Sequence, residues 1–225
     1  LFAVQPSVDG NGVLSFRTAI DAIGTAIVRV RAQDDGASTA PDINQSPEQT
    51  FTVTITPVND APVFTAGPNI TVNEDSSQFT GAWANNIAAA GGLLSVPPTA
   101  TDEIGQGLEF IVAVDRPELF SVQPTLDSTG ALSFTPQANA FGQAVATVVL
   151  KDLGPANAND SNQSTPYALT ISITPQNDAP VAVGDSYSTT EDAILSVDAA
   201  SGLLLNDTDF DIPADTLSVV AGTLT

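Results

Sequence analysis

The chain has 225 residues, of which 26 are Asp or Glu and only 5 are Lys or Arg, and it contains no Cys, His or Met. Without thiol and imidazole groups there are no thiol nucleophiles, Ser-His-Asp triads or Cys/His zinc sites, so we expect a protein that is not an enzyme. A formal net charge of -21 repels nucleic acid phosphates and anionic lipids, so we expect neither nucleic acid partners nor direct membrane insertion.

Alternating apolar and polar residues, rich in Val, Ile, Thr and Phe, predict β-strands along the chain. Only residues 86–94 could form a helical turn, and the Gly91-Gly92 pair disfavours one there. In chain order, the clearest strand segments are 108–112, 144–150 and 168–173. Clusters of Gly, Pro, Asn and Asp separate such segments at short intervals, as at 127–130. We therefore predict an all-β fold of tandem antiparallel β-sandwiches with about seven strands in each unit.

The sequence repeats itself with an offset of 118 residues. Residues 1–6 (LFAVQP) return as 119–124 (LFSVQP), and residues 55–62 (ITPVNDAP) return as 173–180 (ITPQNDAP). About 30 of the first 63 positions are identical at this offset without a gap, which excludes a chance match.

A weaker part of the repeat follows each Asn-Asp-Ala-Pro segment. Residues 73–75 (NED) are matched by 190–192 (TED), and residues 101–102 (TD) by 208–209 (TD). These matches need small gaps, so the segment after each joint differs in length between the two copies of the repeat.

Taking Asn-Asp-Ala-Pro as the joint between units divides the chain into three parts. Residues 1–61 are the second half of one unit, residues 62–179 are a complete unit, and residues 180–225 are the opening part of a further unit. The two end parts together are close to one more unit in length. Either the chain is an excerpt of a longer tandem array, or the end halves of neighbouring molecules complete each other by strand exchange and form a head-to-tail fibre.

The joints and several strand ends carry motifs of a known family. Residues 59–64 (NDAPVF) resemble the N-D-N-A-P-x-F linker of cadherin repeats with one Asn missing, and residues 177–181 (NDAPV) repeat it. Residues 134–142 (FTPQANAFG) and 150–154 (LKDLG) are similar to the F-T-P-x-A-N-x-x-G and V-x-D-x-G run of bacterial cadherin-like repeats. Residues 205–211 (LNDTDFD) look like the L-x-N-D-x-D-x-D-G segment of bacterial Ig-like repeats in large surface adhesins.

This resemblance covers nearly the whole chain and implies a rod of β-sandwiches with Ca²⁺ bound where one unit meets the next. Calcium takes six to eight oxygen ligands, which Asp- and Asn-rich turns supply. Carried over by position, the ligands expected at the first joint are Asn59, Asp60, Asp102, Glu103 and Asp152. The ligands expected at the second joint are Glu74, Asn177, Asp178, Asp207, Asp209 and Asp211.

Departures from the family pattern reduce the expected number of ions. Pro57 and Pro175 stand where the family linker has its leading Asp, and a Thr-Pro-x-Ala-Asn run replaces the family's Leu-Asp-Arg-Glu element. We therefore expect about one or two ions at each joint. An Asp in a turn can also accept amide hydrogen bonds from its own backbone, and we expect this role for Asp9, Asp127 and Asp160.

Together these features predict a calcium-stiffened structural spacer of a large secreted or cell-surface bacterial adhesin or matrix protein, in contact with adjacent repeats of the same chain. The alternative is a module that binds cell-surface polysaccharide or identical molecules, including the head-to-tail fibre. Trp83, Tyr167 and Tyr187 could stack on sugars, although scattered rings more often belong to the core or its rim. A third reading is an accessory segment of a secreted polysaccharide-degrading enzyme with its catalytic domain outside these residues.

Overall fold

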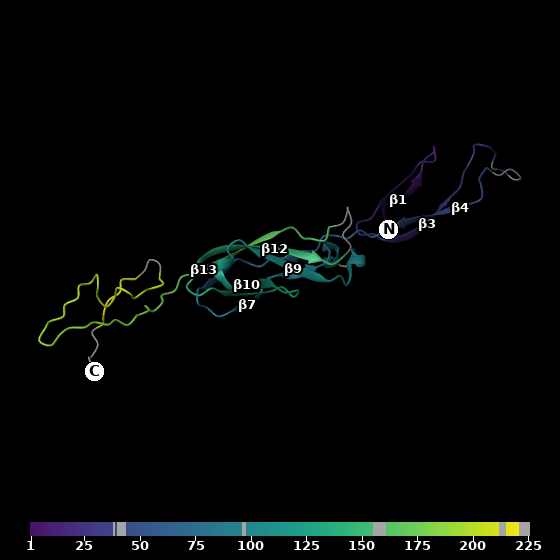
Figure 1. Cartoon of the computed structure of the whole chain (residues 1–225). Helices are drawn as coiled ribbons and strands as arrows, with labels where there is room; N and C mark the ends of the chain where they lie inside the picture. Colours follow the sequence, from purple (N-terminus) through teal and green to yellow (C-terminus); the bar gives the residue numbers. More distant parts are fainter. Residues whose placement is uncertain (38, 40–43, 96–97, 155–160, 212–214, 221–225) are drawn as a thin grey trace.

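The computed structural model describes the chain except for residues 38, 40–43, 96–97, 155–160, 212–214 and 221–225. The described residues form an elongated arrangement of three consecutive parts, of which the first two are built from β-strands (Figure 1). The only helical elements among them are short 3₁₀ turns at Gly91–Leu94, Thr101–Glu103 and Pro117–Leu119. None of the helices described is long and apolar enough to span a membrane.

The middle part is a β-sandwich built from strands β5 to β13. Their bounds are Val63–Thr65 (β5), Ile70–Asn73 (β6), Phe79–Ala82 (β7), Asn85–Ala88 (β8), Leu108–Val114 (β9), Phe120–Leu126 (β10), Ala131–Pro136 (β11), Gly142–Asp152 (β12) and Tyr167–Thr174 (β13). One sheet has the order β6-β13-β12-β9 and the other β10-β11-β7, while β5 and β8 form a separate short pair. All pairs are antiparallel except β13 with β6. The predicted all-β sandwich class is therefore confirmed, as are the strands expected at 108–112, 144–150 and 168–173.

Two details of the middle part differ from expectation. It contains more than the expected number of strands, because the three and four residues of β5 and β8 are too short to show an alternating pattern. The possible helical turn at 86–94 is wrong over its first part, which belongs to β8, and only Gly91–Leu94 forms a 3₁₀ turn.

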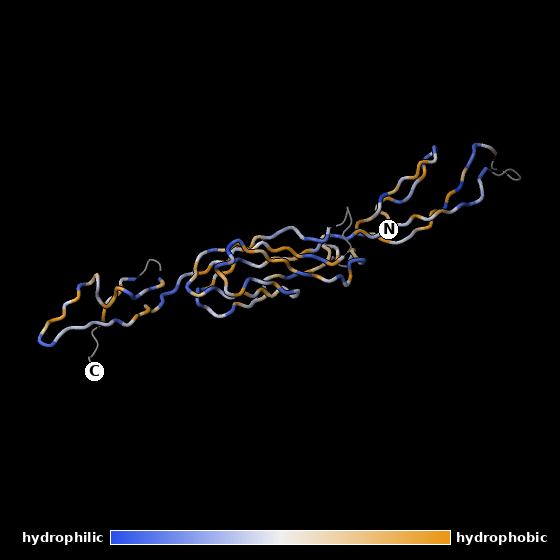
Figure 2. The backbone as a smooth tube through the Cα atoms, in the orientation of Figure 1, coloured by the Kyte–Doolittle hydropathy of each residue, from blue (hydrophilic) through white to orange (hydrophobic). Residues whose placement is uncertain are grey.

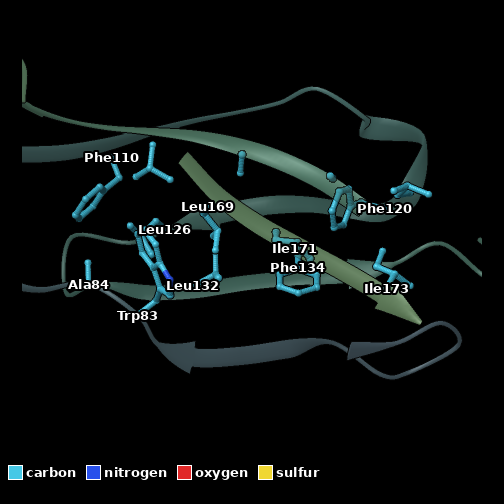
Figure 3. Close-up of a cluster of buried hydrophobic side chains, with 14 of the residues drawn as sticks. Trp83, Ala84, Phe110, Phe120, Leu126, Leu132, Phe134, Leu169, Ile171 and Ile173 are labelled. Carbon is cyan, nitrogen blue, oxygen red and sulfur yellow. The ribbon is translucent and has the colours of Figure 1, made fainter. Parts of the chain in front are cut away.

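The core of the middle part lies between its two sheets (Figure 3). From Ala144 to Asp152 every second residue of β12 is buried, because successive side chains of a strand point to opposite faces. Phe134 is fully buried, and its ring lies 5.0 Å from that of Phe79 and 5.6 Å from that of Phe120. Trp83, the single Trp of the chain, is 3% exposed and donates its indole N–H to the Pro68 carbonyl at 2.8 Å.

Residues 1–61 reproduce the second half of the middle part. Strands β1 (Phe2–Val8), β2 (Leu14–Thr18), β3 (Gly24–Val30) and β4 (Gln49–Ile55) form two antiparallel hairpins. Each residue pair in β1–β2 recurs 118 positions later in β10–β11, including both register shifts. The pairs of β3–β4 recur in the same way in β12–β13. The repeat therefore specifies strand register through local sequence alone.

The tight turns also repeat. Asp9 accepts amide hydrogen bonds from Asn11 and Val13, both at 2.9 Å, and Asp127 accepts the same bonds from Thr129 and Ala131 at 2.9 and 3.0 Å. The expected turn role of these two carboxylates is confirmed, whereas Asp160 lies outside the described residues. In the second turn only Gly fits at position 130, because φ is +87° and a Cβ would overlap the Ala84 carbonyl.

Residues 1–61 and the second half of the middle part differ in how deeply their side chains are buried, although their strand pairing is the same. Leu132 and Phe134 are 0% exposed, whereas their counterparts Leu14 and Phe16 are 37% and 40% exposed. In the middle part these side chains are covered by strands from residues 63–114, and residues 1–61 have no such cover in the structure. Local pairing is thus the same in both copies, but only one of them has a closed core.

Residues 180–225 contain no strand in their described part. Val181 and Thr208 form an isolated antiparallel bridge, with amide-to-carbonyl hydrogen bonds of 2.8 and 3.1 Å. Apolar stretches nevertheless run along this part of the chain (Figure 2). Ile194, Leu205 and Val220 are 96%, 67% and 89% exposed.

We expect Phe134→Ala to lower the free energy of unfolding by about 3–5 kcal/mol, because it empties a closed site in the core. The matched change Phe16→Ala occupies the same repeat position on an open face and should cost less than about 1 kcal/mol. Urea unfolding in dilute solution, followed by circular dichroism and Trp83 fluorescence, measures both values. Equal losses for the two variants would contradict the assignment of the core.

Candidate functional site

The first joint is organised around the side chain of Asn59, which is 5% exposed. Its Nδ2 lies 3.2 and 3.3 Å from the two carboxylate oxygens of Asp152 and 2.9 Å from the Ser161 carbonyl. Its Oδ1 accepts a hydrogen bond from Gln106 Nε2 at 3.0 Å. A Cβ at Gly154 would overlap the Asn59 amide, so this close approach requires glycine. The linker is therefore inserted into the unit that follows it.

Carboxylates gather around this linker. The Asp60 amide donates to Glu103 Oε1 at 3.2 Å, and Glu103 is only 1% exposed. Asp102 and Glu103 sit on the 3₁₀ turn Thr101–Glu103, and Asp152, at the end of β12, is fully buried. The five residues expected at the first joint are thus brought together by the linker, one turn and one strand end.

The charges at the first joint are not balanced. Partial burial, followed by the negative charges of Asp21 and Asp102, raises the pKa of Asp60. Burial also raises the pKa of Glu103, as do the charges of Asp102, Asp60 and Asp152, against the opposing effect of the Asp60 amide. The ion pairs found among the described residues join Arg29 and Arg31 to Glu48 and Arg116 to Glu118, away from this joint. The joint therefore holds excess negative charge in a partly desolvated place.

Asp21 belongs to this group, although the sequence reasoning missed it. It lies between β2 and β3, and its Oδ2 accepts a hydrogen bond from Thr99 Oγ1 of the following unit at 2.6 Å. A Cβ at Gly92 would collide with the same oxygen. The repeat aligns Asp21 with Asn139, and both residues adopt a φ of 54°, so the two loops have the same local backbone conformation.

At the second joint, Glu74 is supplied by the unit that precedes the linker. It follows β6, is 4% exposed, and accepts the Gln176 amide on Oε1 at 2.9 Å. Its other oxygen, Oε2, is buried and has no hydrogen-bond partner in the structure. A buried carboxylate oxygen without a partner is costly, and a cation would satisfy it.

The other expected residues of the second joint come from the linker and from the segment after it. The Asp178 amide lies 3.3 and 3.1 Å from the carboxylate oxygens of Asp211, and the Asp211 amide donates to Asp209 Oδ1 at 2.9 Å. Asp207 accepts the Val183 amide at 2.8 Å. One pocket is lined by Asn177, Asp178, Asp207, Asp209 and Asp215 among other residues.

Burial raises the pKa of Asp211, as do its side-chain hydrogen bond with Asp209 and the negative charges of Asp209 and Asp215, against the opposing effect of the Asp178 amide. Asp215 is a further residue that the sequence reasoning missed, because it follows residues 205–211, the segment that the family resemblance covers. The carboxylates at the second joint therefore repel one another as those at the first joint do.

The two joints share two kinds of hydrogen bond and differ in the burial of the linker Asn. At each joint the side-chain amide of the linker Asn donates to the carbonyl of the next residue, Asp60 at 3.2 Å or Asp178 at 2.9 Å. At each joint the linker Asp amide donates to a carboxylate of the following segment, Glu103 in the first case and Asp211 in the second. Asn59 is buried against Asp152, but its counterpart Asn177 is exposed and its amide reaches only the Asp178 carbonyl at 2.9 Å. Asp152 has no counterpart after the second joint within this sequence.

The oxygen atoms at the joints are of the kinds that calcium binds, although the side chains are not already arranged as a coordination shell. Carboxylate, amide and backbone oxygens are the ligands that calcium prefers, and both joints are rich in them. Within the ranges that the structure describes, no three acidic side chains are arranged closely enough to hold a metal ion as they stand. Ion binding would therefore require the carboxylates to move toward one another.

The three residues considered for sugar stacking, Trp83, Tyr167 and Tyr187, lie in different surroundings. Trp83 is buried, and its ring meets the edge of Tyr167 at a centroid distance of 5.6 Å. Tyr167 and Tyr187 are 40% and 43% exposed and belong to different parts of the chain. The expectation that Trp83 belongs to the core is confirmed.

Comparison with protein-family models and with curated protein sequences finds no match for this chain. The functional interpretation therefore rests on the motifs of the chain and on the geometry of its joints.

We expect Glu103→Gln to raise the melting temperature in EDTA at pH 7, because it removes a buried charge from a repulsive group. The pKa values of Glu103 and Asp60 are raised in the folded state, so the folded chain binds protons more tightly than the unfolded chain. Stability of the metal-free joint should then rise as the pH falls through the raised values toward the ordinary values of 4.5 and 3.8.

The rise in melting temperature caused by Glu103→Gln should accordingly become smaller as the pH is lowered, because Glu103 of the unchanged chain itself becomes protonated. Thermal melts between pH 7 and pH 4 measure this difference, and the exposed Glu191→Gln is the control of equal charge change. A Glu103→Gln effect that is absent, or that does not depend on pH, would contradict the proposed repulsion.

Proposed function

We propose that this chain is a structural spacer of a large secreted or cell-surface bacterial adhesin or matrix protein, and that calcium stiffens its joints. The observation that carries the proposal is the set of uncompensated carboxylates at each junction between consecutive parts of the chain. The resemblance to cadherin-like and Ig-like repeats, based on the linker and strand-end motifs, supports the same function.

At the first joint the chain supplies ligand groups from both sides of the linker. Asn59 and Asp60 come from the linker, Asp21 comes from the part before it, and Asp102, Glu103 and Asp152 come from the unit after it. A bound calcium ion supplies two positive charges and binds six to eight oxygens. The carboxylates, which otherwise repel one another, would then hold the adjoining parts at a fixed angle.

At the second joint the preceding unit contributes Glu74, whose buried Oε2 has no hydrogen-bond partner in the structure. The linker and the segment after it contribute the remaining oxygens, from Asn177, Asp178, Asp207, Asp209 and Asp211.

The affinity expected for such joints fits an extracellular location. Extracellular calcium modules bind with dissociation constants of about 10⁻⁴ to 10⁻³ M, which suits the calcium concentrations outside cells. At a free concentration 100 times the dissociation constant, one site adds about 2.7 kcal/mol to stability. The partners in this proposal are adjacent repeats of the same chain, and polysaccharide binding has less support because Trp83 is buried.

We expect millimolar calcium to change the chain from a flexible to a rigid, elongated particle and to raise its melting temperature. Small-angle X-ray scattering and thermal melts on the same samples, with excess EDTA and then with calcium, measure both effects. Magnesium at equal concentration is the control, because it prefers a small octahedral shell with several waters. An unchanged scattering profile and melting temperature would contradict the proposal.

The ligands of the first joint can be tested by the triple change Asp60→Asn, Asp102→Asn and Asp152→Asn. It should remove most of the calcium-dependent rise in melting temperature that is due to this joint, because Asn retains an oxygen donor but not the charge. The control is the equal charge change Asp185→Asn, Asp192→Asn and Asp198→Asn at exposed positions. Calcium titrations followed by calorimetry should show that the binding due to the first joint is lost in the Asp60, Asp102 and Asp152 variant and kept in the control. Equal binding by the two variants would refute the ligand assignment.

A further inference from the structure

We infer that Asn59 and Gln106 form a two-amide switch at the first joint, and that it couples a cation position beside Asp152 to a second cation position beside Glu103. The switch serves the proposed function, on which this inference rests. Gln106 acts in it as a positioning residue, through its contacts with Asn59 and Glu103.

The side-chain nitrogen of Asn59 occupies a place suited to a cation. Its Nδ2 lies 3.2 Å from the Asp60 carbonyl, 3.2 and 3.3 Å from the carboxylate oxygens of Asp152 and 2.9 Å from the Ser161 carbonyl. An amide nitrogen has only two hydrogens, so it cannot serve four acceptors fully. Calcium binds carboxylate and carbonyl oxygens at about 2.3–2.6 Å. A small inward movement of the same four oxygens would therefore let them hold an ion where Nδ2 now lies.

The charge at this place decides which way the Asn59 amide faces. Without a cation, an Oδ1 atom in the position of Nδ2 would face four oxygens with no hydrogen between them, which is unfavourable. With a cation among these oxygens the preference is reversed, because Nδ2 would face positive charge and Oδ1 would be a ligand atom. Ion binding therefore requires Nδ2 to leave and the amide to turn.

The turn of the Asn59 amide is transmitted to Gln106. Asn59 Oδ1 accepts a hydrogen bond from Gln106 Nε2 at 3.0 Å, and the same Nε2 donates to Glu103 Oε2. Gln106 Oε1 is buried and has no hydrogen-bond partner among the residues that the structure describes. Once Asn59 presents Nδ2 in place of Oδ1, the Gln106 amide has to turn as well and present Oε1. This second turn gives the unpartnered oxygen a donor.

Both amide oxygens lie against the backbone of Gly154. A Cβ there would overlap Asn59 Oδ1 and would lie 2.7 Å from Gln106 Oε1. Glycine at this position therefore leaves room beside both amides for them to turn.

The turn of Gln106 releases Glu103. This carboxylate is 1% exposed and accepts two hydrogen bonds, from Gln106 Nε2 on Oε2 and from the Asp60 amide on Oε1. Loss of the Gln106 donor leaves Oε2 available to a second cation, next to Asp102 on the same 3₁₀ turn. The first ion thereby favours the second. Direct repulsion between two cations has the opposite effect, so positive coupling is the signature of the switch.

The chain offers a backbone amide as a reporter of each position. The Gly154 amide donates to Asp152 Oδ1 at 2.9 Å, and the Asp60 amide donates to Glu103 Oε1. We expect both ¹⁵N resonances of the full chain to shift over the same range of calcium concentration in an NMR titration. Asp152→Asn should raise the calcium concentration at the midpoint of the Asp60 shift about fivefold or more, because coupling between sites is typically about 5–150-fold.

Gln106→Met tests the link, because Met has a similar length and no amide. In this background Asp152→Asn should no longer raise the midpoint of the Asp60 shift. Gln143→Met is the matched control, since Gln143 is exposed and its amide donates to Ser172 Oγ at 3.3 Å. A purely structural role of Gln106 would lower the melting temperature and leave the dependence on Asp152 intact.

The unchanged chain provides a second measurement that does not depend on the folding of any variant. The side-chain ¹⁵N resonances of Asn59 and Gln106 should shift together with the Gly154 amide as calcium is added, because the two amides turn as a pair. Trp83 fluorescence verifies folding of the middle part in each variant, because this single Trp lies in its core.

Three results would overturn the switch alone. They are an Asp60 midpoint that Asp152→Asn leaves unchanged, an effect of Asp152→Asn that persists beside Gln106→Met, and a shift of the Asn59 side chain without one of Gln106. Calcium would still bind in each case, and the spacer function would stand. If neither the Gly154 nor the Asp60 amide responded to millimolar calcium, the first joint would bind none, and the switch and the calcium-stiffened joint would both be refuted.

Discussion

The structure depends on how carboxylates are held where one part of the chain meets the next. A carboxylate that leaves water needs hydrogen-bond donors or positive charge nearby, and both are scarce at the joints. Asn59 supplies donors to Asp152, and the Asp60 amide supplies one to Glu103, but the neighbouring acids still raise the pKa values of Asp60 and Glu103. The linker is inserted into the following unit at the place where these groups meet, and Gly154 allows the close approach of Asn59 there. A bound calcium ion would replace the repulsion between these carboxylates with the attraction of each of them to a shared cation.

The repeat separates what local sequence determines from what requires distant partners. Both copies have the same strand pairs, the same register shifts and the same turns capped by Asp9 and Asp127. Only the copy with residues 63–114 in place buries its Leu and Phe side chains completely. Hairpins therefore form from turn chemistry and alternation, whereas closure of the sandwich depends on strands that are far away in the sequence.

The sequence predicted the long strands because alternate burial leaves a clear trace, as along β12. Segments as short as β5 and β8 leave none, and the apparent helical turn after Asn85 proved to be partly strand. The residues of both joints were predicted from the linker repeat and the family resemblance, and the structure places them around the linkers. Asp21 and Asp215 were missed because they lie outside the linkers and outside the positions that the resemblance carried over as ligands, and only the folded chain shows that they are near the joints.

The parallel pairing of β6 with β13 has a mechanical consequence. Strand β6 follows the first joint, β13 leads into the second, and the two strands run side by side in the same direction through four residue pairs. Tension applied along the chain would pull β6 back toward the first joint and β13 forward toward the second. The hydrogen bonds between them would then be loaded in shear and would have to break together, whereas a hairpin pulled at its open end unzips one pair at a time. The unit is built to resist stretching along its own axis.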